Sequence, residues 1–314
     1  NVDRAHELVL NTIAGALVNS GASPNLTSVT KFGSGKWILS GANTFTGDLR
    51  VYGGNLTLDY GVSDALSTGN VFTHLGTLEF KGKSTGVTTE TVNNLTISDG
   101  INGLGRLVLN GNGGSGVNLT INTLNSNAGN SQRHDLIDIS GNAGNSITVG
   151  AVGTAIGMTN GVLMGAGSAR ANIILRDKDG TYGFAALSGA TSGTIQKLQV
   201  ANQTVLAAGG VTMNTATTNY LINAAGTYTQ AAATNAVFNT LTMDSTAGAI
   251  TLDLGANAMP AGGSGAGKAV LFTGSNDITI TGTSAGIGTS ALWFHNYIDP
   301  GKAHNLNASF GASN

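Results

Sequence analysis

Two short charged segments contain the residue types that acid–base catalysis or cation binding requires. Residues 133–138 read Arg-His-Asp-Leu-Ile-Asp, and residues 176–181 read Arg-Asp-Lys-Asp-Gly-Thr. Clustered carboxylates with basic neighbours can act as general acid and base on a sugar, or supply oxygen ligands to calcium. These two segments are therefore the candidates for a catalytic or metal site.

The pattern around the first segment favours a structural role. Asp138 follows the apolar residues Leu136 and Ile137 in a short alternating run. Alternation with period two is typical of a half-buried strand, whose polar positions face solvent. We therefore expect Asp138 on the exposed face of a strand.

The second segment contains an Asp-x-Asp-Gly run that starts at Asp177 and can open a calcium loop. The later ligands of such a loop, including its final Glu, are missing. A charged hairpin turn through Asp179 and Gly180 is the favoured interpretation, because Asp-Gly is a common turn pair. Calcium binding near Asp177 and Asp179 stays open as the alternative.

Other catalytic motifs are absent from the sequence. No Gly-x-Ser-x-Gly motif occurs, and residues 265–268 (Gly-Ala-Gly-Lys) lack the spacing and the following Ser or Thr of a phosphate-binding loop. The histidines form neither His-x-His nor His-Glu-x-x-His; they are His6, His74, His134, His295 and His304. We therefore predict no catalytic, cofactor-binding or metal-ligating residue, and we expect that the protein is not an enzyme.

Composition excludes several classes of partner and fold. The 314 residues include 48 Gly, three Pro and no Cys, and only 10% are charged, with a net charge of −2. This charge does not favour nucleic acid, no apolar run is long enough to span a membrane, and disulfides are impossible. A chain rich in Gly, Asn, Thr and Ser, with 40% hydrophobic residues, indicates an ordered all-β structure with many tight turns.

Short alternating segments recur along the chain between Gly, Asn, Ser and Asp turns. The unit Asn-Leu-Thr begins at Asn25, Asn55, Asn94 and Asn118. Imperfect repetition of short strands, at spacings near one coil, is typical of a solenoid. We predict an all-β fold, a right-handed parallel β-helix (β-solenoid) with terminal caps; a β-sandwich is the alternative.

One segment resembles a known family. Residues 31–58 contain Gly-x-Gly at Gly33, the run Ser-Gly-Ala-Asn-Thr-Phe-Thr-Gly from Ser40, and Gly-Gly-Asn-Leu-Thr-Leu from Gly53. This pattern is similar to the autotransporter-associated β-strand repeat, also called the passenger-associated transport repeat. The resemblance covers about 28 residues and implies a bacterial extracellular β-helix, usually a surface-displayed passenger.

The two ends of the chain differ from its middle. Apolar residues at helical spacing within residues 3–18 predict an amphipathic helical cap with Asp3 as N-cap; a strand that pairs with a neighbouring molecule is the alternative. Residues 291–297 are unusually aromatic, which predicts a hydrophobic cap or a subunit contact. We therefore expect a cap or assembly segment at 1–30, a β-solenoid at 31–290 and an aromatic cap or assembly segment at 291–314.

These observations favour a non-enzymatic structural protein of the bacterial cell surface. We expect a self-assembling subunit of a filament, sheath or layer, whose partner is the same chain, joined through sheet edges and end caps. The alternative is a monomeric adhesin that binds glycan or host matrix, for which Trp37, Tyr52 and Tyr60 are aromatic candidates. A carbohydrate-active β-helix enzyme is less favoured; activity lost on substitution of Asp135, Asp138, Asp177 or Asp179 would indicate it.

The expected location is extracellular. The chain starts at Asn1 without a charged and apolar leader and ends at Asn314 without the amphipathic strands of an outer-membrane barrel. We therefore expect a secreted form whose leader has been removed, either a processed passenger or a secreted relative.

Overall fold

A computed structural model describes most of the chain as short β-strands. The described residues are 10–21, 26–63, 66, 71–73, 76–97, 103–126, 133–165, 171–233, 235–259, 268–287 and 292–312. They contain no α-helix, only the two 3₁₀ turns η1 (Val200–Asn202) and η2 (Ser245–Ala247). The chain divides into two compact units: unit 1 comprises 1–156, 173–180 and 187–195, and unit 2 comprises 157–172, 181–186 and 196–314.

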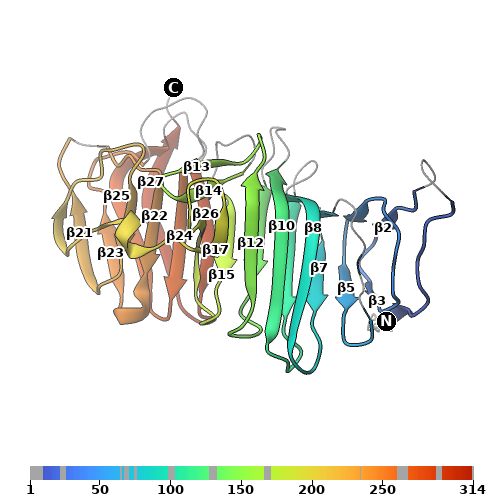
Figure 1. The fold of residues 1–314 in the computed structure, drawn as a ribbon. Coiled ribbons are helices and arrows are strands. Elements are labelled where there is room, and N and C mark those ends of the chain that lie inside the picture. Colours follow the sequence, from blue (N-terminus) through green and yellow to red (C-terminus); the bar gives the residue numbers. More distant parts are fainter. Residues whose placement is uncertain are drawn as a thin grey trace, which may run out of the picture. The chain divides into compact units, whose positions relative to one another are not determined.

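Unit 1 is a stack of coils in which the chain alternates between two parallel ladders of strands (Figure 1). The first ladder contains β1 (Leu10–Ile13), β3 (Lys36–Leu39), β5 (Asn55–Asp59), β7 (Thr77–Lys81), β9 (Gly103–Asn110), β11 (Arg133–Asp138) and β15 (Ile173–Arg176). The second contains β2 (Val29–Lys31), β4 (Leu49–Val51), β6 (Val71–Thr73), β8 (Val87–Ile97), β10 (Gly116–Ser126) and β12 (Ser146–Val152). The first residues of β17 (Gly193–Lys197) pair antiparallel with β12.

The strands of the first ladder of unit 1 carry a column of apolar side chains that is buried in the interior of the stack. Leu39, Leu58, Phe80 and Leu109 occupy one register position on β3, β5, β7 and β9, and all four are buried. Because side chains alternate between the two faces of a strand, the positions between them face outward. The predicted period-two alternation is therefore confirmed. Phe45, in the connection between β3 and β4, is also fully buried.

Asn and Asp side chains end many of the strands. The Oδ1 atom of Asp59 accepts a hydrogen bond from the backbone N–H two residues later at 2.9 Å, and Asn110 and Asn142 make the same turn at 3.0 and 2.8 Å. Such turns bend the chain without using a strand's own hydrogen bonds. Gly54 takes a corner at φ 64°, which a side chain rarely adopts. At these corners the Asn and Gly residues thus have a structural reason.

Unit 2 repeats the same arrangement with a separate pair of parallel ladders (Figure 1). The first ladder contains β18 (Thr204–Val205), β20 (Asn219–Ile222), β22 (Thr240–Asp244), β24 (Lys268–Gly274) and β26 (Leu292–Ile298). The second contains β19 (Gly209–Val211), β21 (Gly226–Gln230), β23 (Ile250–Asp253), β25 (Ile278–Ile287) and β27 (His304–Ala312). The hairpin β13 (Gly157–Thr159) and β14 (Val162–Met164) pairs antiparallel, and β14 also pairs with β16 (Tyr182–Leu187) at Ala186.

The core of unit 2 is an apolar cluster between its two ladders. Ile222, Met243 and Phe272 share a register position on β20, β22 and β24 and belong to one buried cluster. The next position on each of these strands therefore faces outward. The stacked parallel coils of both units confirm the predicted β-solenoid, and the alternative of a β-sandwich is set aside.

The N-terminal prediction of a helix is wrong where the structure describes it. Residues 10–13 form β1, which pairs in parallel with β3, while residues 1–9 lie outside the described residues. The helical spacing of apolar residues was outweighed by the hydrogen bonds that β3 offers to a strand. The aromatic C-terminal stretch forms β26, the last strand of its ladder. The predicted boundaries at 30 and 290 stay predictions.

Candidate functional site

Asp138 lies on the outward face of β11, but it is buried, contrary to the sequence prediction. Its side chain is only 5% exposed, because cationic side chains from neighbouring coils lie against it. Arg106 Nη2 is 2.6 Å and Arg176 Nη1 is 3.6 Å from Asp138 Oδ2, and Ser140 donates to Oδ1 at 2.7 Å. This carboxylate therefore joins three coils of unit 1.

Burial alone would raise the pKa of Asp138, but hydrogen bonds from Ser140 and Arg106 outweigh burial and hold the pKa below its ordinary value. Asp135 shares the inward parity of Ile137 and is also buried. The two carboxylates of the first charged segment thus point to opposite faces of β11. They do not form a pair that could share acid–base work on one substrate.

The second charged segment forms a tight turn directly after β15. The backbone N–H of Gly180 donates to the Asp177 carbonyl at 2.8 Å, and Gly180 has φ 79°. This geometry is the turn that the sequence predicts. Among the described residues, no group of three or more His, Asp or Glu side chains is placed to hold a metal ion.

The aromatic candidates for glycan contact lie in different surroundings in unit 1. Tyr60 is buried and stacks on Phe80 with ring centroids 6.3 Å apart. Trp37 has the inward register of Leu56, and Tyr52 stacks on the exposed ring of Phe32 at 5.1 Å. Two of the three proposed contacts are therefore turned into the solenoid rather than outward.

The first coils of unit 1 leave their interior open. A cavity of about 290 Å³ lies between the two ladders there, lined by Ile13, Val29, Thr30, Lys31, Phe32, Trp37, Leu39 and Leu56. Trp37 is 37% exposed although it faces inward, and Phe32 is 68% exposed. Lys31 is buried, and its Nζ donates to the carbonyls of Phe32 and Gly33 at 2.7 Å. The end of this stack therefore presents apolar surface that its own described coils do not cover.

The last coil of unit 2 has a similar character. Leu292, Phe294 and Ile298 point inward from β26 and pack against the apolar core, but they stay partly exposed. Among the described residues, β26 pairs only with β24 and β27 only with β25. This end therefore also combines open strand edges with partly covered apolar side chains.

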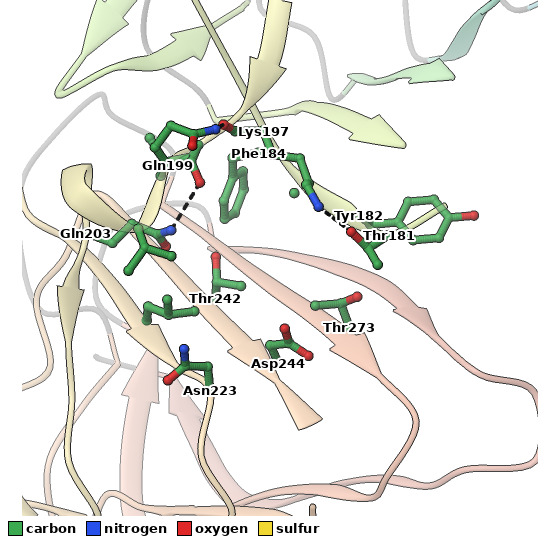
Figure 2. A pocket seen from close by; sticks show the side chains of 14 residues that line it. Thr181, Tyr182, Phe184, Lys197, Gln199, Gln203, Asn223, Thr242, Asp244 and Thr273 are labelled. Carbon is green, nitrogen blue, oxygen red and sulfur yellow. Dashed lines mark hydrogen bonds between the residues drawn. The ribbon is translucent and has the colours of Figure 1, made fainter. Parts of the chain in front are cut away.

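Unit 2 holds a cleft of about 320 Å³ on the outward face of its first ladder (Figure 2). The floor comes from Leu221, Asn223, Thr242, Asp244 and Thr273, on or just after β20, β22 and β24. The opposite wall comes from two covering segments, residues 181–184 and 197–203. Figure 2 shows Thr242, Asp244 and Thr273 on the floor strands, with Lys197 and Phe184 across from them.

The covering segments are tied to each other. The backbone N–H of Leu198 donates to the Phe184 carbonyl at 2.8 Å, and Lys197 Nζ donates to Thr181 Oγ1. Gln203 Nε2 donates to the Leu198 carbonyl at 3.2 Å. The wall of the cleft is therefore a connected structure with fixed polar groups.

Sequence reasoning missed this cleft. Its floor residues are single polar residues in separate alternating strands, and the sequence carries no motif that links them. The Thr-x-Asp pattern of Thr242 and Asp244 on β22 is a signal, since both positions must face outward. Only the register between coils shows which residues lie beside them.

Comparison with known families identifies one segment. Residues 29–58 match the family model of the passenger-associated transport repeat. The chain carries this repeat. The match confirms the resemblance seen in the sequence, and the repeat spans β2, β3, β4 and most of β5. No curated protein and no solved structure matches the chain.

The repeat and the stacked parallel coils fit an autotransporter-passenger-like domain with a structural or adhesive role. Such a passenger repeat points to a surface or secreted protein. Among the described residues, no helix is long and apolar enough to cross a membrane.

Proposed function

We propose that this protein is a non-enzymatic subunit of an extracellular bacterial filament, sheath or layer, and that copies join end to end. The observation that carries the proposal concerns the first coil of unit 1, β1–β2, and the last coil of unit 2, β26–β27. Among the described residues, each strand of these coils pairs with a strand on one side only, and the apolar side chains there are incompletely covered. Open edges are templates for pairing with another chain.

The edge of β2 is oriented for such pairing. Val29 donates its backbone N–H to Asp48 at 2.8 Å, and the Lys31 carbonyl accepts from Tyr52 at 2.8 Å. In a parallel ladder alternate residues of an edge strand bond to the neighbour. The N–H and C=O of Thr30, between them, therefore point away from β4 and toward an incoming strand.

Low charge favours close contact between copies. Only 10% of residues are charged and the net charge is −2, so long-range repulsion between copies is weak. Inward-facing Trp37 and the exposed ring of Phe32 would lose contact with water when another coil stacks on the end. The association would thus combine backbone hydrogen bonds with apolar burial.

Thr30→Pro tests the proposal with little effect on the subunit. Proline removes the outward N–H of Thr30 while the bonds of Val29 and Lys31 to the next coil remain. Thr30→Val keeps the N–H and is the matched control. We expect ordered polymers of wild type and of Thr30→Val in negative-stain microscopy at increasing concentration, and loss of polymers for Thr30→Pro with unchanged circular dichroism.

Polymers of Thr30→Pro that equal those of wild type would contradict pairing through this edge. Isolated particles of wild type at every concentration would contradict self-assembly itself. That second result would favour the monomeric adhesin that the sequence leaves as the alternative.

A further inference from the structure

One column of polar side chains crosses the outward face of unit 2. Asp244 is opposite Thr273, and Thr273 is opposite Tyr297, on β22, β24 and β26. Ile222, the last residue of β20, is opposite Met243 on β22. Asn223 and Asp244 are the next residues on the two chains, and Asn223 therefore lies beside Asp244. Neighbouring strands lie about 4.8 Å apart. An amide, a carboxylate, a hydroxyl and a phenol therefore follow one another along the stack, one on each successive coil.

The fold orients Asp244 without using all of its hydrogen-bonding capacity. Its Oδ1 accepts from the N–H and the hydroxyl of Thr246 at 3.0 and 2.6 Å. Among the described residues, no cation lies within salt-bridge distance of this carboxylate. Oδ2 therefore stays available as an acceptor at the floor of the cleft.

The wall of the cleft adds groups of both kinds. Gln203 Oε1 is buried and has no hydrogen-bond partner among the described residues, so the wall holds an acceptor that the fold does not use. Lys197, held by Thr181, supplies a donor, and Gln199 supplies a second amide. Tyr182, whose ring stacks on that of Tyr297, supplies apolar ring surface, while Phe184 is buried behind the wall against His295. Donors, acceptors and an aromatic ring thus surround one space.

We propose that this cleft binds a neutral oligosaccharide, with its chain lying along the column Asn223–Asp244–Thr273. One carboxylate and one ammonium line the cleft. An anionic ligand would be repelled by Asp244, and a cationic ligand would be repelled by Lys197. A neutral ligand rich in hydroxyl groups can bond to both. Pockets of roughly 300 Å³ and more accommodate small ligands, and this one has room for one or two sugar rings.

The same lining favours binding over cleavage. Glycoside hydrolysis uses two carboxyl groups on either side of the glycosidic bond. Asp244 is the single carboxylate among the described residues that line the cleft. The site therefore has the groups that hold a sugar chain and lacks the second acid that would cut it.

Isothermal titration of the full chain with cellotetraose, laminaritetraose and chitotetraose tests the proposal, with tetragalacturonate as the charged comparison. We expect at least one neutral tetrasaccharide to bind. Asp244→Asn should weaken that binding roughly tenfold or more, because a hydrogen bond to a charged group is lost. Asn223→Ala removes a neutral, exposed amide and should weaken binding roughly threefold.

Asp253→Asn is the matched control for Asp244→Asn. Asp253 makes the same turn, with Oδ1 accepting from Gly255 at 2.9 Å, but it lies on the other ladder and does not line the cleft. Its substitution should leave binding unchanged. Binding of none of the neutral tetrasaccharides, binding of tetragalacturonate alone, or wild-type affinity in both cleft variants would overturn the proposal. The result does not depend on whether copies assemble.

Discussion

The outward polar columns of the two units are built alike and used differently. In unit 1, Glu79 accepts from Thr57 at 2.7 Å and from Asn110 at 2.9 Å, which lie on the coils before and after it. In unit 2, Asp244 makes its hydrogen bonds within its own turn, to Thr246. Polar groups that bond between coils hold a solenoid together, whereas polar groups that bond locally remain able to bind something else.

Cations follow the same division. Lys81 is 2.9 Å from Asp59 on the preceding coil, and Arg106 is 2.6 Å from Asp138 on the following one. In unit 2, Lys197 donates to Thr181 at the wall of the cleft. Lys81 and Arg106 of unit 1 thus link neighbouring coils, whereas Lys197 of unit 2 lies at the wall of the cleft.

Gly54→Ala should have the largest effect, because it breaks the stacking of unit 1 at a corner. A Cβ there would lie 2.4 Å from the Gly35 carbonyl oxygen of the previous coil, at φ 64°. Left-handed strain and overpacking together predict a loss of about 3 kcal/mol in the free energy of unfolding, measured by urea denaturation.

Gly33→Ala is the control for this corner. Gly33 has φ 74°, but a Cβ would meet nothing within 4 Å. Only the conformational cost, about 1–2 kcal/mol, should remain. Equal losses for both variants would show that contact between coils is not what makes Gly54 necessary.

Asp138→Ala should have the next largest effect. It removes the hydrogen bonds of Arg106 and Ser140 to a buried carboxylate and should cost about 2 kcal/mol in urea denaturation. Asp48→Ala removes an exposed pair with Arg50 of similar length, 2.7 Å, and should cost under about 1 kcal/mol. A smaller loss for Asp138→Ala than for Asp48→Ala would contradict the linking role of Asp138.

Acid should weaken unit 1 through the same groups. Hydrogen bonds hold the pKa values of Asp138 and Glu79 below their ordinary 3.8 and 4.5 despite burial. Their contribution to stability is therefore complete above pH about 4.5 and is lost as pH falls through the lowered values. Thermal melts from pH 6 to pH 3 should show a falling midpoint, with a shallower fall for Asp138→Asn. An unchanged slope in that variant would contradict this account.

Asp244→Asn should have the smallest effect on stability. The amide oxygen of Asn can keep the turn to Thr246, and no bond to another coil is lost, so the free energy of unfolding should change by less than about 0.5 kcal/mol. Asp253→Asn should behave the same way. A large destabilisation by Asp244→Asn would place this carboxylate among the structural links instead.

The β-solenoid fold could be predicted from the sequence, but the pairing register between successive coils could not. Alternating runs located most strands, and Asn55, Asn94 and Asn118 do lie in β5, β8 and β10. The Asn-Leu-Thr units fall on both ladders, however, so their spacing does not give the coil length. Register shows that Asn55 is followed on its ladder by Thr77 and then by Arg106, so successive coils differ in length.

The unequal lengths of the coils explain why the cleft in unit 2 could not be predicted from the sequence. Asp244 and Thr273 become neighbours only because β22 and β24 pair on the same ladder. The length of the connection between these two strands cannot be read from a local sequence pattern. The same holds for Asp138, whose burial depends on Arg106 and Arg176 from other coils. Turn chemistry, by contrast, is local, and the turn at Asp177–Gly180 could be predicted from its own residues.

Sedimentation velocity of the wild-type chain over a hundredfold range of concentration tests end-to-end assembly most directly. End-to-end assembly predicts species that grow with concentration in steps of one 31.4 kDa subunit, without a closed limit, since the two joining surfaces differ. A single 31.4 kDa species at every concentration would contradict it.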